Sequence, residues 1–216
     1  FFMTFLYKNS SKIEIIRTSK PISYDKALKF MKKRVDGIFS GSETEAVWFL
    51  EHLSVYTLGN SQTAPKKEIN NIPVIKTNRG GKMTWHGPGQ KIIYLMINFK
   101  KRGYDIRYFV NCLEQYIIDT LDQFDIKAFR KKNLIGIWTK NKSCRDAKIA
   151  SLGLRVSRGV IYHGISINLS CDLKNFSHIE ACGIKNPTVT SVSELKSYSV
   201  LDKINQTLEK RIFDYL

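Results

Sequence analysis

The amino-acid sequence predicts an α/β fold of the α+β type, with a mixed sheet, in a single domain over residues 1–216. Helix-like and strand-like patterns are interspersed, but they do not follow the strict strand–helix–strand alternation of a doubly wound parallel sheet. A short Ser-Arg-Gly connection at residues 157–159 separates two strand-like runs and suits an antiparallel hairpin. The chain is 43% hydrophobic, and no repeat, low-complexity block or linker divides it, so we expect one globular unit.

The first half of the chain is predicted to hold helices followed by strands. Apolar residues spaced three or four apart form one helical face, namely Tyr24, Leu28, Met31 and Val35. Ser42 followed by Glu45 is a capping-box pattern, which predicts a second helix that continues to Leu53. Apolar runs predict strands over residues 53–58, 72–77 and 92–99. The last of these runs is almost wholly apolar, so we expect it to be buried on both faces.

The second half is predicted to hold a long helix, three strands and a terminal helix. The clearest helical spacing in the sequence is that of Val110, Leu113, Ile117, Leu121 and Phe124. Strands are expected over residues 134–139, 148–156 and 160–169, and the last two would form the hairpin. A final helix is expected within residues 201–213.

The chain is strongly basic, with 35 Lys and Arg against 19 Asp and Glu and a formal net charge of +16. Such a charge steers association with acidic partners, which include nucleic acids, anionic membranes and acidic proteins. A general bias toward lysine, without meaning for any partner, is an equal alternative. No apolar run approaches the roughly 20 residues that a membrane span needs, so no membrane association is predicted.

Cysteine usage and the N-terminal residues predict a cytoplasmic protein. The four cysteines, Cys112, Cys144, Cys171 and Cys182, form no Cys-x-x-Cys pair. A disulfide framework and a cysteine-rich zinc site are therefore not expected, and free thiols are typical of a reducing compartment. The first residues lack the basic region and small-residue cleavage site of a secretory signal. The histidines also lack the spacing of a metal-binding motif, so we predict no metal.

The densest group of chemically useful residues lies at residues 79–90, RGGKMTWHGPGQ. Gly80 and Gly81 allow the backbone to approach a ligand or to adopt positive φ. Arg79 offers a rigid cationic fork, and His86 can donate or accept a proton near neutral pH. Trp85 offers an apolar wall, unless it lies in the core behind a plain turn. The segment matches neither a phosphate loop nor a dinucleotide-binding fingerprint.

Two further groups contain candidate catalytic residues. Residues 148–166, KIASLGLRVSRGVIYHGIS, begin with Lys148, which could point into a semi-apolar pocket and act as a base or an electrostatic partner. Cys182 precedes Gly183, which would leave space around a nucleophilic sulfur. For each residue alone the commoner alternative is structural: a solvated lysine, and a small buried thiol.

Taken together, these three segments resemble the lipoyl(octanoyl) transferase family, also called lipoate–protein ligase B. The resemblance extends in order from about residue 48 to residue 194 and includes the Glu-His at residues 51–52 and the Tyr-Thr-Leu-Gly at residues 56–59. It implies the fold of biotin and lipoate ligases, a mixed sheet around an acyl tunnel. One departure is Ala181 before Cys182, where the family usually has Pro.

The resemblance implies an enzyme that moves an octanoyl group from octanoyl-acyl carrier protein to a lysine of a lipoyl domain, without a cofactor. The acceptors would be the lipoyl domains of 2-oxoacid dehydrogenases and the glycine cleavage H protein. It places the nucleophile at Cys182 and a catalytic lysine at Lys148. It places substrate-binding residues at Arg79, Gly80, Gly81, Lys82, Met83, Thr84, Trp85, His86, Ser151, Leu152, Gly153, Gly164, Ile165 and Ser166.

Two alternative functions remain open from the sequence. An ATP-dependent lipoate or biotin ligase on the same fold would activate a free acid as an adenylate, and nucleotide binding would distinguish it. A nucleic-acid-binding protein would fit the charge, but zinc-finger and RNA-recognition signatures are absent, and the aromatic residues are not interleaved with the basic run at residues 127–148. We therefore predict no nucleic-acid partner.

Overall fold

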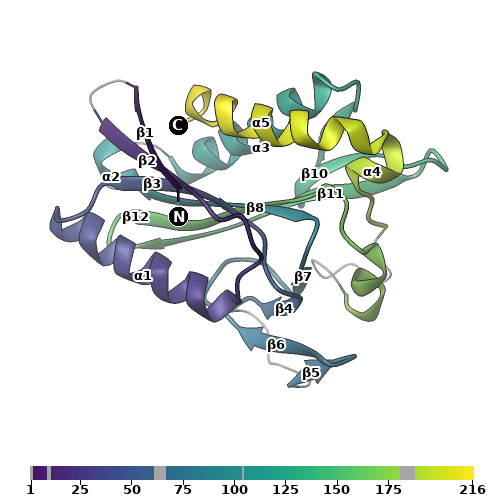
Figure 1. Cartoon of the computed structure of the whole chain (residues 1–216), viewed down its shortest axis with the longest axis horizontal. Helices are drawn as coiled ribbons and strands as arrows, with labels where there is room; N and C mark the ends of the chain where they lie inside the picture. The colour runs from purple at the N-terminus through teal and green to yellow at the C-terminus, as the bar shows by residue number, and fades with distance from the viewer. Residues whose placement is uncertain (1, 9–10, 61–66, 104, 181–187) are drawn as a thin grey trace.

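An eight-stranded sheet runs through the centre of the protein (Figure 1). The computed structural model describes residues 2–8, 11–60, 67–103, 105–180 and 188–216. The strand order is β1-β2-β3-β8-β12-β11-β10-β9, in which β2 and β3 are parallel and the other neighbours are antiparallel. Its strands are β1 (Phe2–Lys8), β2 (Ser11–Arg17), β3 (Glu45–Leu50), β8 (Gln90–Asn98), β9 (Ala128–Lys131), β10 (Leu134–Lys140), β11 (Asp146–Ser157) and β12 (Val160–Asn168).

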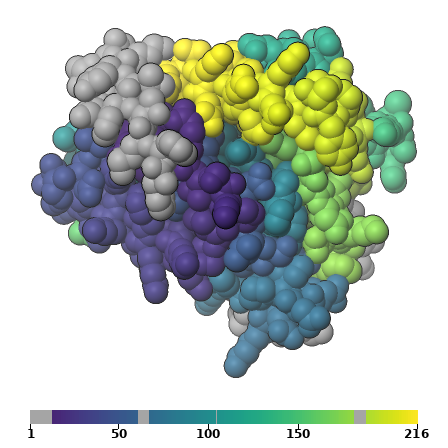
Figure 2. Space-filling view, viewed as in Figure 1, coloured from purple at the N-terminus to yellow at the C-terminus, as the bar shows by residue number. Residues whose placement is uncertain are grey.

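A smaller sheet lies beside one end of the large sheet (Figure 1). Its order is β5-β6-β4-β7, from β4 (Val55–Leu58), β5 (Glu68–Ile69), β6 (Ile72–Lys76) and β7 (Thr84–His86). On the face seen in Figure 2, the β5 and β6 region in blue and the C-terminal region in yellow lie at opposite ends. The glycine-rich segment predicted to bind substrate connects β6 to β8 and contains β7, so the small sheet holds it against the large one.

Helices cover both faces of the large sheet (Figure 1). Helix α1 (Tyr24–Ser40) packs on β8 and β12 from one side, while α3 (Ile106–Asp122) and α5 (Leu201–Arg211) cover the other. Shorter helices are α2 (Phe99–Arg102), α4 (Val192–Leu195) and the 3-10 helices Leu173–His178, Tyr198–Val200 and Ile212–Asp214. Within the described residues, none of the helices has the length and apolar character to cross a membrane.

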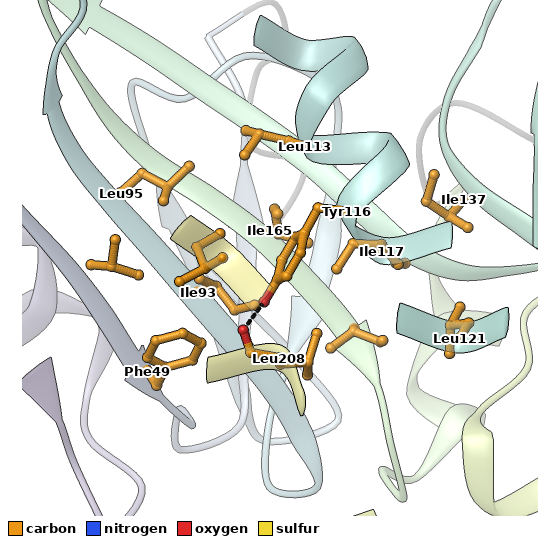
Figure 3. Close-up of a cluster of buried hydrophobic side chains, with 14 of the residues drawn as sticks. Phe49, Ile93, Leu95, Leu113, Tyr116, Ile117, Leu121, Ile137, Ile165 and Leu208 are labelled. Carbon is orange, nitrogen blue, oxygen red and sulfur yellow. Dashed lines mark hydrogen bonds between the residues drawn. The ribbon is translucent and has the colours of Figure 1, made fainter. Parts of the chain in front are cut away.

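The main core lies between the large sheet and helices α3 and α5 (Figure 3). Leu113 and Ile117 of α3 face Ile93 and Leu95 of β8, and all four are fully buried. Tyr116 brings a hydroxyl into this core and donates it to the carbonyl oxygen of Leu208 at 2.6 Å. Each such buried aliphatic side chain contributes about 1.5–3 kcal/mol to folding, so this core strongly stabilises the packing of α3 and α5 on the sheet.

The mixed α/β fold that the sequence predicts is confirmed, as are most of its elements. The first and long helices form as α1 and α3, and the terminal helix forms as α5. The hairpin between β11 and β12 also forms. Arg158 and Gly159 take φ values of 50° and 82° at its turn, which is the positive-φ geometry of a type I′ hairpin.

The predicted helix from Ser42 to Leu53 is wrong. Residues Glu45–Leu50 form β3, which pairs with β2 on one side and β8 on the other. Ala46 to Leu50 are all buried, so both faces of this strand are covered, and a continuous apolar run of this kind suits a central strand. Ser42 instead donates its hydroxyl to the carbonyl of Gly37 at the end of α1.

Candidate active site

A narrow cavity of about 60 Å³, here called the inner cavity, lies between the two sheets and the start of α1. Predicted substrate-binding residues that line it are Arg79, Gly81, Lys82, Thr84, His86, Ser151, Leu152, Gly153, Gly164, Ile165 and Ser166. They come from the glycine-rich segment, β7, β11 and β12. The fold therefore brings together three stretches that are separate in the sequence, residues 79–86, 151–153 and 164–166. The other lining residues are Tyr24, Ile92, Tyr94 and His163.

Glycines let the backbone segments around the inner cavity approach closely. Gly164 of β12 pairs with Gly153 of β11 and with Tyr94 of β8. A Cβ atom on Gly164 would lie 2.0 Å from the carbonyl oxygen of Ile93, which is far inside contact distance. Gly81 has a φ of +86°, a conformation that favours glycine. The sequence signal of repeated glycine therefore has a steric basis here.

Arg79 forms part of the cavity wall and is held by backbone and hydroxyl groups. Its Nη2 donates to the carbonyl oxygen of Thr57 at 2.7 Å and to the Thr57 hydroxyl at 2.8 Å. Its Nη1 donates to the carbonyl oxygen of Gly80 at 2.9 Å. Arg79 is 8% exposed, so its guanidinium supplies a fixed positive charge inside the site.

Strand β7 points alternate side chains to opposite sides. Thr84 and His86 line the inner cavity, whereas Trp85 packs edge-on against Phe176 with ring centroids 5.6 Å apart. Met83 lies in the same apolar cluster as Trp85. The structure thus places Met83 and Trp85 in the core behind β7 and not in the cavity wall. For Trp85, a place in the core is the alternative that the sequence left open.

Buried histidines surround the inner cavity in neutral form. Nδ1 of His52 donates to the carbonyl oxygen of Ile22 at 3.0 Å, so its Nε2 accepts the hydroxyl of Tyr94 at 2.7 Å. Burial lowers the pKa of His52 to about 4 and the pKa of His163 to about 3. Burial, with the nearby His52 and Arg79, also lowers the pKa of His86 well below its ordinary value. These rings offer hydrogen bonds and no charge at neutral pH.

His163 is held in a backbone conformation that is unusual for its residue type. Its φ is +64° although it lies within β12, next to Gly164. Its Nε2 donates to Oδ1 of Asn78 at 3.0 Å, and its ring stacks on Tyr162 with centroids 4.7 Å apart. Backbone strain of this kind clusters at functional sites and persists where neighbours hold it in place.

The neutral histidines make folding stability dependent on pH. Unfolded histidine has a pKa near 6.5, so between about pH 4 and 6.5 the unfolded state binds more protons than the folded state. We expect the free energy of unfolding to fall as the pH is lowered from 7.5 to 5.0, as measured by urea denaturation. His163→Asn removes one of these groups, and asparagine tolerates positive φ, so the fall should be smaller.

The exposed His178 provides the matched control for this prediction. His178→Asn should leave the pH dependence of the wild type unchanged. An equal pH dependence in His163→Asn and wild type would contradict the assignment of His163.

A chain of hydrogen bonds connects the inner cavity to Lys148. Nδ1 of His86 donates to Gln90 at 2.7 Å, and Gln90 donates to Oδ1 of Asn168 at 2.9 Å. Asn168 in turn donates to the carbonyl oxygen of Thr190 at 3.0 Å, and the Thr190 N–H donates to the carbonyl oxygen of Lys148 at 3.0 Å. His86 is therefore oriented by a network that also fixes the backbone of Lys148.

Lys148 lies in a second, wider cavity of about 390 Å³, here called the outer slot. It is 7% exposed, and its Nζ lies 5.6 Å from the centroid of the Trp138 ring. Gly136 makes room for it, because a Cβ atom there would lie 2.3 Å from Cε of Lys148. The outer slot shares Gly81, Lys82, Leu152 and Gly153 with the inner cavity. The predicted residue Gly80 lines the outer slot but not the inner cavity. Lys148 thus lies where a long ligand passing between the cavities would run.

The remaining predicted residue, Cys182, lies outside the described residues, as does Gly183. The described cysteines are less suited to act as nucleophiles. Burial raises the pKa of the Cys171 thiol to about 12, Cys112 lies in α3, and Cys144 is exposed in a turn. In the described part of the chain, no group of three or more His, Cys, Asp and Glu side chains could hold a metal ion.

The sequence missed several residues of the site. Tyr24 was placed on the apolar face of a helix, but it lines the inner cavity, and His52 supports Tyr94 from behind. His163 shares a His-Gly pattern with His86, which was the one available signal. The Glu-His at residues 51–52 is part of the resemblance but gives His52 no role, and the place of Tyr24 depends on contacts between distant parts of the chain.

Comparisons with known proteins show what the chain is similar to. Residues 23–212 match the family model of the lipoyl protein ligase A/B catalytic domain. An octanoyltransferase of Rickettsia bellii is 42% identical over 200 residues, which cover 91% of this chain and 96% of the relative. One from the Wolbachia of Brugia malayi is 40% identical over 202 residues, covering 93% and 98%. The solved structure of a putative lipoate protein ligase from Thermoplasma acidophilum with bound lipoic acid matches this chain with a TM-score of 0.68 at 15% identity. The match covers 93% of this chain and 84% of the ligase chain, and at this identity it shows only that the two chains share a fold.

Proposed function

Because this chain belongs to the lipoyl protein ligase A/B catalytic family and is an octanoyltransferase, we propose that it takes the octanoyl group from octanoyl-acyl carrier protein and transfers it to a lipoyl-domain lysine through a thioester on Cys182. The acceptors would be lipoyl domains of 2-oxoacid dehydrogenases and the glycine cleavage H protein. We also propose that it works in the cytoplasm. The reaction needs no cofactor, because the energy of the donor thioester drives amide formation.

The observation that carries this proposal is the position of Lys148 in the outer slot, which shares four lining residues with the inner cavity. Its N–H donates to the carbonyl oxygen of Thr188 at 2.9 Å. Cys182 precedes Thr188 by six residues, and a chain of six residues spans at most about 20 Å. This tether supports a pairing of Cys182 with Lys148 in the reaction.

The proposed reaction has two steps. The Cys182 thiolate attacks the carbonyl carbon of the donor thioester, the bond from that carbon to the carrier sulfur breaks, and the carrier leaves as a thiolate. The amine of the acceptor lysine then attacks the new thioester, the amide bond forms, and the Cys182 thiolate is released. The amine must lose a proton in this step, and Lys148 is the group proposed to take or relay it. Backbone N–H groups next to Gly183 or in the glycine-rich segment would stabilise the oxyanion.

The inner cavity is proposed to hold the octanoyl chain, with its wall residues as the binding set. Gly164 and Gly153 leave the space, and Ile92 and Ile165 supply apolar surface. His86 orients or closes this site and does not serve as the base, because its pKa is lowered by burial and its Nδ1 is committed to Gln90. Met83 and Trp85 would support β7 from behind rather than contact the acyl chain.

The test follows the acyl group by intact mass. When the wild type is mixed with octanoyl-acyl carrier protein, its mass should increase by one octanoyl group, and peptide mapping should locate this group on the Cys182 peptide. The added mass should disappear when a lipoyl domain is added. Cys182→Ser should gain no increment. Acceptor modification without an adduct would show direct transfer. No adduct and no product, but ligation of free octanoate in the presence of ATP, would support the ligase alternative.

The net charge of +16 predicts that the rate depends on ionic strength. Acidic protein partners associate faster with a basic enzyme, and salt screens this attraction. We expect kcat/KM for the carrier-bound donor to fall at least about tenfold between 50 and 500 mM salt, while kcat stays nearly constant. A flat profile would leave the charge without a role in partner encounter.

A further inference from the structure

The outer slot opens where β10 and β11 separate. β10 pairs with β11 only over the segment from Asp146 to Ala150, whereas β12 pairs with β11 from Ala150 to Ser157. The ladder between β10 and β11 shifts register at Ile137 and Trp138. Within the described residues, β11 beyond Ala150 therefore has β12 on one side and no strand on the other.

This free side of β11 presents backbone hydrogen-bonding groups. The carbonyl oxygen of Leu154 accepts the N–H of Gly80 at 3.2 Å, so it points away from β12. Backbone groups alternate between the two sides of a strand, so those of Leu152 and Val156 point the same way. Extended ligands bind such edges by adding main-chain hydrogen bonds.

The walls of the slot are apolar and reach solvent. Ile106 and Val110 of α3 line one side, and Leu134 and Ile135 of β10 line another. Ile106 is 38% exposed and Ile135 is 64% exposed, although both are large aliphatic residues. A volume of about 390 Å³ falls within the usual range of small-molecule sites. The slot leads inward to Lys148 and to the residues that it shares with the inner cavity.

We propose that the outer slot binds the pantetheine arm of the thioester donor, extended along the free edge of β11. This inference rests on the proposed function, because it assigns a place to the donor of that reaction. The arm is a linear chain with two amide groups, which can bond to backbone groups such as those of Leu152, whereas the carbonyl oxygen of Leu154 already accepts the N–H of Gly80. Its two methyl groups match the aliphatic walls at Ile106 and Ile135.

The arm fits this slot better than a hairpin of the acceptor does. A protein hairpin is two chains wide and carries side chains on both faces of its strands, whereas the arm is a single chain with small substituents. The slot is enclosed by α3, by β10 and by the glycine-rich segment, and its inner end is at Lys148. A thioester at the end of the arm would therefore reach the junction of the two cavities with the octanoyl chain directed inward.

The experiment compares two small donors that differ only in the length of the arm. Octanoyl-pantetheine carries the whole arm, and octanoyl-N-acetylcysteamine lacks its outer part. For the wild type we expect kcat/KM to be about tenfold higher with octanoyl-pantetheine. Ile135→Trp should fill the slot and remove this advantage, lowering kcat/KM for octanoyl-pantetheine about tenfold and leaving that for octanoyl-N-acetylcysteamine unchanged.

The control is Leu53→Trp, which places the same side chain at a position that is 53% exposed and away from the slot. It should keep the preference of the wild type. Equal use of both donors by the wild type, or equal losses for both donors in Ile135→Trp, would overturn the proposal. A loss confined to discharge of acylated enzyme by the lipoyl domain would assign the slot to the acceptor instead. Failure of both donors to acylate the enzyme would contradict the proposed function.

Discussion

Replacing Lys148 with methionine is expected to lower kcat for octanoyl transfer by about 10²–10⁴-fold, which is the range for loss of a general acid–base group. Methionine keeps most of the volume beside Gly136 and Trp138 and removes only the ammonium group. The backbone bonds from residue 148 to Thr188 and Thr190 do not depend on its side chain. The loss should therefore appear in single-turnover transfer while the unfolding midpoint in urea stays close to that of the wild type.

Lys140→Met is the matched control, because Lys140 lies on the neighbouring strand β10 with its side chain 62% exposed. It pairs with Asp146 at the surface, and such pairs contribute little to stability. This variant should retain the activity of the wild type. Normal turnover in Lys148→Met, together with unchanged alkylation of Cys182 by iodoacetamide, would show that Lys148 has no part in the chemistry.

Replacing Gly164 with alanine is expected to reduce the free energy of unfolding by about 3 kcal/mol or more, since overpacking against rigid atoms is at the costly end of its range. The new Cβ would lie 2.0 Å from the carbonyl oxygen of Ile93 and 3.1 Å from its carbonyl carbon. These are backbone atoms of the adjacent central strand, so they cannot rotate away as a side chain can. Urea denaturation followed by tryptophan fluorescence measures the change.

Gly153→Ala is the matched control, because Gly153 is the direct partner of Gly164 on β11. Its nearest contacts would be 3.3 Å to the carbonyl oxygen of Gly80 and 3.4 Å to Cδ of Arg79, which small shifts can accommodate. We expect a loss below about 1 kcal/mol for this variant. Equal losses at the two positions would show that the close packing of β12 on β8 does not explain the glycine.

The sequence was informative wherever a single segment contains its own signal. The period of α3, the turn at Arg158 and the grouping of glycines all depend on neighbours along the chain. Residues 45–50 show where such signals fail, because a local capping pattern at Ser42 competed with tertiary burial on both faces of β3. Pairing with β2 and β8 determined the outcome, and neither partner is visible from the segment itself.

The candidate site could be predicted as a set of residues, but not as a geometry. The sequence named Lys148 and the three stretches that meet around the inner cavity, yet it could not assign directions to their side chains. Trp85 and His86 are adjacent and lie on opposite sides of β7, which depends on a strand of only three residues. The roles of His52 and Tyr24 arise from packing between the start of α1, the segment that joins β3 to β4, and β8, so they required the fold.

The free edge of β11 also bears on how copies of this protein behave at high concentration. Unpaired strand edges are templates for intermolecular pairing, and proteins protect them with short lengths and charged side chains. Lys82, which lines the slot, and the exposed Arg155 of β11 place positive charge near this edge. Two such edges repel each other, and the net charge of +16 adds to this repulsion. We therefore expect the positive charge to oppose pairing between the β11 edges of two copies.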